Sequence, residues 1–505
     1  MSRVRNTIKN IKAGVLNKVI TLLLPFIART VLIKVLGSEY AGLSSLFVAI
    51  LQVLNLAELG IGTAITFSLY KPAAEEDTVT IRATMNLYKK IYRIIGVVVL
   101  IIGFALMPFL SYMIEGEVPG DINLYVLYLL YLLNASLTYF LFAYKTILLE
   151  VHQKNNVISN INTVLFLFQF AYQMVVLVCF KNYYLYIAIM PFITVANNVI
   201  GAYYARKIYP QYYCKGKLPK GRRREIRKRV YGLMIQRLCA TTRNSLDSIF
   251  ISAYLGLNMV AIYNNYYMIS NAITGFLIVL TTAMTASVGN SVATESVDKN
   301  YDDMNKINFL YMLVSGICTI CLLCLYQPFM ESWLGNSFLL GMVPVVLLCL
   351  YFYVLKMGDV LSAYTQGAGL WWEGRYRAVA EALLNIILNA VLGKIMGVTG
   401  IILGTLISLV LVNFFYGTTI IFKYYFKKNS IMRYFRRHLI YFIVTCFVAL
   451  ICYFVTSNIP LDGYFGVLLK GVICLLISVV TLLAIYYKIG YTKEVKPVIR
   501  KILKK

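Results

Sequence analysis

Eleven ionisable side chains lie inside long apolar stretches of the sequence, and they are the first candidates for chemistry. Seven are basic and four are acidic, so the apolar interior carries a net positive charge. A charge at the centre of a membrane span costs about 2.5–3.5 kcal/mol on insertion scales and usually faces a polar interior or pathway. The set therefore predicts a site for an anionic group. Its members are Lys18, Arg29, Lys34, Arg237, Arg243, Lys356 and Lys470, with Glu58, Asp247, Asp359 and Glu381.

Two of these basic residues share one face of the first apolar stretch. Lys18 and Arg29 are eleven residues apart, which is three helical turns. Pro25 lies between them, where a proline frees a carbonyl and can kink a gating helix. We predict that both bind the substrate, although either could instead extend its charge to the headgroups. Lys34 and Lys470 lie near the outer interface, where we expect such snorkelling.

Three further basic residues are predicted to bind the substrate: Arg237, Arg243 and Lys356. Two of them have an acidic neighbour at helical spacing, Asp247 four residues after Arg243 and Asp359 three residues after Lys356. Each pair is either a self-neutralised structural bridge or a switch, in which an anionic ligand or a cation such as Na⁺ or H⁺ competes for one partner. The aspartates are accordingly candidates for ion coupling or charge pairing.

Polar residues extend the predicted lining of the interior. Glu381, Asn385 and Asn389 recur every four residues and so share one helix face. Amides and hydroxyls suit sugars, but they also join helices by hydrogen bonds, and the spacing does not separate the two roles. The predicted polar lining consists of Gln236, Asn264, Asn265, Asn271, Glu381 and Asn385.

No residue set in the sequence predicts catalysis. The two histidines, His152 and His438, lie in or beside predicted cytoplasmic loops, without a nearby nucleophile or a partner at metal-ligand spacing. The sequence also lacks the glycine-rich loop with lysine that binds nucleotide phosphates. We therefore expect a protein that is not an enzyme and has no metal or other cofactor.

The elements that must position these residues are membrane-spanning helices. The chain has 505 residues and 60% apolar content, far more than a soluble core can bury. About 20 apolar residues cross a bilayer as a helix. Fourteen such stretches lie near 13–36, 42–70, 91–113, 122–143, 157–180, 183–205, 231–255, 260–290, 307–330, 338–361, 378–396, 400–422, 439–457 and 464–487.

The distribution of positive charge predicts the orientation. With the N-terminus inside, 39 of the 48 lysines and arginines lie in inner segments, and only Lys181 and Lys394 lie in outer loops. This bias places both termini in the cytoplasm. The net charge of +27 is then explained by topology and by attraction to anionic membrane lipids, so nucleic acid is not a predicted partner.

The chain also contains a repeat. Val35-Leu36-Gly37 followed by Ala41-Gly42-Leu43 recurs 219 residues later as Tyr254-Leu255-Gly256 followed by Val260-Ala261-Ile262. Six spans per half would give parallel repeats around an axis normal to the membrane, as in transporters. The predicted divisions are a six-helix bundle at 1–205, a basic cytoplasmic linker at 206–230, a second six-helix bundle at 231–430, and two further helices with a basic tail at 431–505.

The N-terminal part resembles the opening of Wzx-type polysaccharide flippases. These form the bacterial oligosaccharide branch of the multidrug/oligosaccharidyl-lipid/polysaccharide (MOP) exporter superfamily. Elsewhere the likeness rests on the span count and the two-bundle repeat. The residues that carry it are Leu24-Pro25-Phe26-Ile27-Ala28-Arg29, Leu36-Gly37, Tyr40-Ala41-Gly42-Leu43, Leu46-Phe47 and Glu58-Leu59-Gly60-Ile61-Gly62.

The resemblance implies a function in glycan export. It implies that undecaprenyl-diphosphate-linked oligosaccharide crosses the cytoplasmic membrane of a bacterium by alternating access, for capsule, exopolysaccharide or O-antigen assembly. Implied partners are this lipid-linked oligosaccharide, a polysaccharide polymerase and glycosyltransferases. Other hypotheses stay open: a cation-coupled multidrug antiporter, a lipid II or teichoic-type glycolipid flippase, and a membrane scaffold. Multidrug relatives often carry an acidic residue in span 1, and this span has none.

Overall fold

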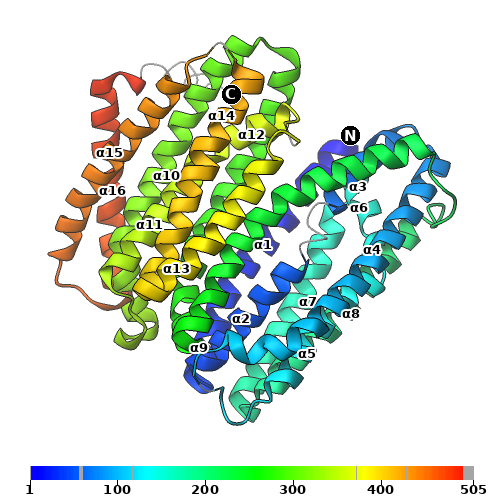
Figure 1. Cartoon of the computed structure of the whole chain (residues 1–505), viewed down its shortest axis with the longest axis horizontal. Coiled ribbons are helices and arrows are strands. Elements are labelled where there is room, and N and C mark those ends of the chain that lie inside the picture. Colours follow the sequence, from blue (N-terminus) through cyan, green and yellow to red (C-terminus); the bar gives the residue numbers. More distant parts are fainter. Residues whose placement is uncertain (1, 56–60, 117, 371, 428, 493–505) are drawn as a thin grey trace. The chain divides into compact units, whose positions relative to one another are not determined.

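The computed structural model describes residues 2–55, 61–116, 118–370, 372–427 and 429–492, and every regular element among them is helical (Figure 1). In this described part of the chain, nine helices are long and apolar enough to cross a membrane. The number is ten if the bent pair Leu124–Phe140 and Ala143–Val151 forms one span. The predicted all-α, multi-pass membrane fold is therefore confirmed.

The chain divides into two compact units, residues 1–261 and 262–505. The domain boundaries predicted at 205, 230 and 430 remain predictions. The first unit contains α1 (Ser2–Val35), α2 (Ser38–Leu54), α3 (Ile61–Ala74), α4 (Thr78–Leu106), α5 (Leu124–Phe140), α6 (Ile147–Val151), α7 (Asn155–Val175), α8 (Tyr183–Ile208) and the first part of α9 (Lys220–Thr294). Short turns of 3-10 or π-helix extend α4 and α7 and precede α6.

The second unit contains the rest of α9 and the C-terminal helices. They are α10 (Val297–Leu334), α11 (Met342–Met357), α12 (Asp359–Gly367), α13 (Arg375–Ser408), α14 (Gly417–Ile421), α15 (Ile431–Ser457) and α16 (Gly463–Ile489). π-Helical turns at Leu409–Tyr416 and Phe422–Phe426 flank α14, so that the helical path from α13 runs on to residue 426.

Glycines with positive φ interrupt the two longest helical runs. Gly256 in α9 has φ 78° and Gly397 in α13 has φ 58°, a region that side chains with a Cβ rarely adopt. These positions match the predicted ends of spans at residues 255 and 396. Gly37, which precedes Gly256 by 219 residues in the predicted repeat, has φ 117° between α1 and α2. The repeated sequence thus forms a glycine break in both places.

One predicted span is only partly described. In the stretch near 42–70, the structure describes α2 up to Leu54 and α3 from Ile61. Glu58, one of the predicted interior acids, falls in the intervening segment and lies outside the described residues.

In unit 1, α1 packs along α7, α7 packs along α8, and α5 packs against both α4 and α8 (Figure 1). In unit 2, α10 is the central helix, because α11, α15 and α16 all pack against it. The two C-terminal helices therefore add apolar packing around α10. Their contacts include an aromatic cluster in which Phe309 of α10 meets Tyr441 of α15 and Tyr486 of α16.

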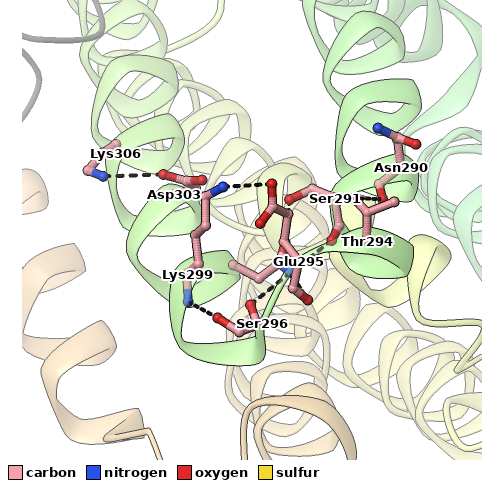
Figure 2. A network of polar contacts seen from close by, with 9 residues as sticks. Asn290, Ser291, Thr294, Glu295, Ser296, Lys299, Asp303 and Lys306 are labelled. Atoms are coloured by element: carbon pink, nitrogen blue, oxygen red, sulfur yellow. Dashed lines mark hydrogen bonds and ion pairs between the residues drawn. The ribbon is translucent and has the colours of Figure 1, made fainter.

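A polar turn joins α9 to α10 (Figure 2). The Ser296 hydroxyl accepts a hydrogen bond from the Lys299 amide at 3.3 Å and so caps the start of α10. The Lys299 amine forms an ion pair of 2.6 Å with Glu295. The Asn300 side chain, which is fully buried, donates to the Ser291 carbonyl at 3.1 Å. These contacts satisfy the free backbone groups at the ends of both helices.

Candidate functional site

The two predicted basic residues of α1 have different surroundings. Lys18 is exposed. Arg29 is half-buried, and its guanidinium donates to the Ala41 carbonyl at 3.0 Å, to the Ser45 hydroxyl at 3.1 Å and to the Ala261 carbonyl at 3.3 Å. Arg29 thereby joins α1 to α2 and α9 within unit 1. Its predicted contact with substrate stays a prediction, and would require the exchange of some of these bonds.

A cluster of buried tyrosines lies near Arg29 in unit 1. The Tyr131 hydroxyl donates to the Ser44 hydroxyl at 3.1 Å and lies 3.3 Å from the Tyr183 hydroxyl. Tyr183 donates in turn to the Tyr40 carbonyl at 3.1 Å. These bonds tie α5 and α8 to α2. Arg29 therefore belongs to a polar layer that joins α1, α2, α5, α8 and α9. The positions of the charges in the sequence do not indicate this layer.

The predicted residues of α9 are only partly described. Gln236 and Arg237 lie on this helix, but their side chains are outside the described part. Arg243 and Asp247 are buried, with 6% and 3% exposure, and lie one helical turn apart. Their predicted pairing stays a prediction. Next to them, the Ser245 hydroxyl donates to the Gln52 side chain at 3.1 Å and joins α9 to α2.

The pair on α11 and α12 forms the ion pair that its spacing predicts. The Lys356 amine lies 3.3 Å from the Asp359 carboxylate, and the Tyr311 hydroxyl of α10 donates to the same carboxylate oxygen at 2.5 Å. The Lys356 side chain is 4% exposed and that of Asp359 is 28% exposed.

One expectation for the lysines is wrong: Lys470, expected to reach the interface, is 8% exposed on the face of α16 that packs inward.

The predicted polar lining separates into two groups. Asn271 is exposed, Asn264 is half-buried and Asn265 is fully buried, all on the second part of α9. On α13, Asn385 and Asn389 are buried, and Asn385 donates to the Thr405 hydroxyl at 2.8 Å across the break at Gly397. The α13 amides therefore make hydrogen bonds between helix segments. This is one of the two roles that the spacing left open.

Glu381 belongs to the same polar row on α13. Its carboxylate accepts a hydrogen bond from the Asn413 amide at 2.9 Å, and the residue is 2% exposed.

Both histidines contact neighbouring side chains. His438, expected in or beside a loop, is buried on α15 with its Nε2 2.9 Å from the Asn308 amide. His152 stacks on Tyr209, with ring centroids 4.2 Å apart.

A pocket of about 310 Å³ lies between α1, α7 and α8 within unit 1. The residues that line it do not belong to the sequence-predicted set. Four carry amides and one a hydroxyl; they are Asn17, Thr21, Asn162, Gln169 and Asn197. Leu165, Phe166 and Ile193 complete the lining, which contains no ionisable residue. The pocket is thus uncharged, with amide and hydroxyl groups set among apolar side chains.

Helical spacing brings this lining together. Asn162, Leu165, Phe166 and Gln169 follow the i, i+3, i+4, i+7 pattern of one face of α7. The α1 and α8 contributions are each a pair at i, i+4. This polar stripe within an otherwise apolar span is the signal that could have revealed the pocket from sequence.

The pocket amides differ from the other amides of the same helices. Within the described part of the chain, the side chains of Asn162, Gln169 and Asn197 have no hydrogen-bond partner in the protein. By contrast, Gln173 of α7 donates to a carbonyl of α8 at 3.1 Å, and Asn198 donates to a carbonyl one turn earlier at 2.9 Å. The bundle therefore satisfies these two amides and leaves Asn162, Gln169 and Asn197 open to a ligand or water.

The helices and their glycine breaks define an all-α, multi-pass membrane protein. Residues 7–286 match the family model described as polysaccharide biosynthesis protein. Because this match covers more than half of the chain, the protein belongs to that family. A search of curated proteins finds no match.

Solved structures with the same fold include the lipid II flippase MurJ in an inward closed conformation. Its TM-score is 0.63 at 14% identity, over 96% of this chain and 99% of MurJ. An inward-facing multidrug resistance MATE transporter of the MOP superfamily has a TM-score of 0.56 at 16% identity, over 81% of this chain and 96% of the transporter. A mutant of the Vibrio cholerae MATE transporter VcmN has a TM-score of 0.58 at 11% identity, over 86% of this chain and 99% of VcmN. The predicted membership of the MOP superfamily is confirmed.

Proposed function

We propose that the protein is a flippase that exports undecaprenyl-diphosphate-linked oligosaccharide units across the cytoplasmic membrane of a bacterium. The observation that carries this proposal is the match of residues 7–286 to the polysaccharide biosynthesis family. The MOP fold supports it, because this fold is shared with a lipid II flippase. The glycan serves capsule, exopolysaccharide or O-antigen assembly, with a polymerase and glycosyltransferases as functional partners.

The topology that we propose has fourteen spans with both termini in the cytoplasm. The described part contains nine apolar helices of sufficient length and one bent pair. Two of the nine, Ser245–Thr294 and Arg375–Phe426, have 50 and 52 residues, more than twice the roughly 20 that one crossing needs. Each belongs to a helical path that accommodates two spans, since α9 (Lys220–Thr294) breaks at Gly256 and the path that starts with α13 breaks at Gly397. With α1 and the α2–α3 segment, the count reaches fourteen.

The mechanism that we propose is alternating access with the polyprenyl tail in lipid and the headgroup inside the protein. The basic residues Lys18, Arg29, Arg237, Arg243 and Lys356 are the proposed partners of the diphosphate. Two negative charges that move outward across an inside-negative membrane gain about 4.6 kcal/mol per 100 mV. The membrane potential is then sufficient to drive export without ATP.

The test is a flipping assay with purified protein in proteoliposomes. A fluorescent undecaprenyl-diphosphate glycan is placed in both leaflets, and dithionite quenches the label that reaches the outer leaflet. We expect a faster second quenching phase than in empty vesicles, and a further increase when a K⁺ gradient with valinomycin sets a potential that pulls negative charge toward the dithionite. A rate equal to that of empty vesicles rejects the proposal.

A cation-coupled multidrug antiporter is the second candidate, because MATE transporters share the fold. This candidate needs an acid free to bind H⁺ or Na⁺. Asp359 already contacts Lys356 and Tyr311, which disfavours cation binding at this carboxylate. Drug resistance on overexpression that is lost with Asp247→Asn or Asp359→Asn would favour the antiporter over the flippase.

A further inference from the structure

We propose that the pocket between α1, α7 and α8 is a binding subsite for an uncharged sugar ring of the transported glycan. This inference rests on the proposed export of a lipid-linked oligosaccharide and adds a site to it. The observations that carry it are the open pocket volume of about 310 Å³ and the amides of Asn162, Gln169 and Asn197, which lack protein partners among the described residues.

Asn162 and Gln169 are half-buried and Asn197 is exposed, and amides without a protein partner at the half-buried positions of a membrane protein require an explanation. A polar group without a hydrogen bond is costly where water is scarce, and membrane helices therefore satisfy their amides internally. The neighbouring Gln173 and Asn198 follow this rule, each bonded to a backbone carbonyl. Three pocket amides depart from it on two facing helices, Asn162 and Gln169 on α7 and Asn197 on α8. Such an arrangement fits groups that are satisfied only when a hydrogen-bonding ligand replaces water.

The chemistry of the lining selects the class of ligand. No ionisable residue lines the pocket, so it supplies no counter-charge for a phosphate or a cationic drug. Each amide offers both donors and an acceptor, which matches hydroxyl and acetamido groups. Phe166 adds an aromatic surface beside them. The volume lies at the lower end of the roughly 300–1,000 Å³ typical of small-ligand pockets, which suits a sugar ring.

The pocket is held in shape by a direct bond between two of its helices. The Asn17 amide of α1 donates to the Thr163 hydroxyl of α7 at 2.9 Å, and Thr163 donates to the Ser159 carbonyl at 2.8 Å. This contact lies beside the pocket rather than across it, because Thr163 does not line the pocket. A rigid frame with open amides is the arrangement expected for a preformed binding site.

The test measures sugar binding to the full-length protein in detergent, without transport. The probes are free chitotriose and maltotriose, followed by saturation-transfer NMR and by thermal unfolding. We expect wild-type protein to give saturation transfer to at least one probe and a Kd in the millimolar range. Asn162→Leu and Gln169→Met should each weaken this binding at least tenfold. The matched control is Asn160→Leu, an exposed position of α7 outside the pocket, which should bind as wild type does.

Stability distinguishes a binding role from a structural one. Replacement of an unpartnered amide by an apolar side chain of similar size should leave the unfolding temperature unchanged or raise it, because no protein hydrogen bond is lost. A fall in unfolding temperature for Gln169→Met would indicate a structural amide and overturn the proposal. So would unaltered sugar binding by both pocket variants, or the absence of binding of either probe to wild type.

The flipping assay separates this inference from the proposed function. If wild type flips the glycolipid and the pocket variants flip it equally fast, the subsite is rejected while the flippase stands. If wild type binds sugar through these residues but does not flip the glycolipid, the subsite stands and the flippase is rejected. Loss of both sugar binding and flipping in the two variants, with normal activity of Asn160→Leu, supports both.

Discussion

The ion pair between Lys356 and Asp359 allows a quantitative test of how this protein tolerates charge among its helices. The Lys356 amine lies 3.3 Å from Asp359, and its side chain is only 4% exposed. Asp359 begins α12, is 28% exposed, and also accepts a hydrogen bond from Tyr311. The two partners therefore differ in how well water can replace the interaction.

The expected magnitude follows from the distance and the exposure. At 3.3 Å and an effective dielectric constant of 20, the attraction is about 5 kcal/mol, which solvent near Asp359 reduces. Removal of one partner from a buried pair costs about 3–5 kcal/mol, because the other charge is left unpaired. We expect Asp359→Asn to cost about 3 kcal/mol, since it strands the buried lysine. Lys356→Met should cost only about 1–2 kcal/mol, since the remaining carboxylate is better solvated and keeps Tyr311.

The assay is a double-mutant cycle on purified protein, with the free energy of unfolding measured by denaturant titration in mixed micelles. The double variant Lys356→Met/Asp359→Asn should be more stable than the sum of the single effects predicts, with a coupling energy of about 2 kcal/mol. Asp302→Asn, an exposed carboxylate on α10, is the control and should change stability by less than about 0.5 kcal/mol. Additive single effects, within about 0.5 kcal/mol, would refute the reasoning.

Four further predictions concern unit 1. Arg29→Lys should lower the unfolding temperature, because one amine cannot reach all three acceptors of the guanidinium; unchanged stability with lost transport would instead support its predicted substrate contact. Gly42→Val should prevent the close approach of α2 to the Leu257 carbonyl, and a cysteine cross-link between these helices should report the increased separation. Arg82 donates to the Gln211 carbonyl at 2.7 Å, so Arg82→Ala should speed proteolysis of the segment between α8 and α9. Burial raises the pKa of the Cys214 thiol in that segment, so maleimide should label it slowly at neutral pH and faster as pH rises; rapid labelling at neutral pH would contradict this.

The glycine breaks are the part of the fold that the sequence predicts best. Gly256 and Gly397 lie where apolar runs pause, and both adopt positive φ. The recurrence of the pattern around Gly37 is likewise matched by the backbone. Such breaks are local, because a residue without a Cβ can adopt a conformation that others avoid. A single sequence is enough to locate them.

Contacts between helices are predicted less well. The spacing of Lys356 and Asp359 is visible in the sequence, and the ion pair forms. The three acceptors of Arg29 come from α2 and from α9, far away in the chain, and no local pattern indicates them. Whether a half-buried arginine joins helices or faces a cavity depends on residues that are distant in the chain. The local sequence does not show which residues these are.

The charged residues of the sequence do not predict this pocket, because its lining contains no ionisable residue. Asn162 and Gln169 lie seven residues apart in an apolar span, a spacing as regular as that of Glu381 and Asn385. The α13 amides prove to join helix segments, whereas the α7 amides line a pocket. Sequence spacing alone assigns both rows to a helix face. Only the partners of each amide separate structural hydrogen bonds from open ones.

The energetics of charge explain why the two kinds of polar residue differ in this structure. An unpaired charge among membrane helices is costly, and accordingly Lys356 and Asp359 pair with each other and the Arg29 guanidinium is held by carbonyls. An open amide costs less than an open charge, so a membrane protein can retain it in a pocket. Neutral recognition can therefore be preformed, as between α1, α7 and α8. The proposed binding of a phosphate by Arg29 or Lys356 would instead replace bonds that already exist, and would thereby couple anion binding to a change in helix contacts.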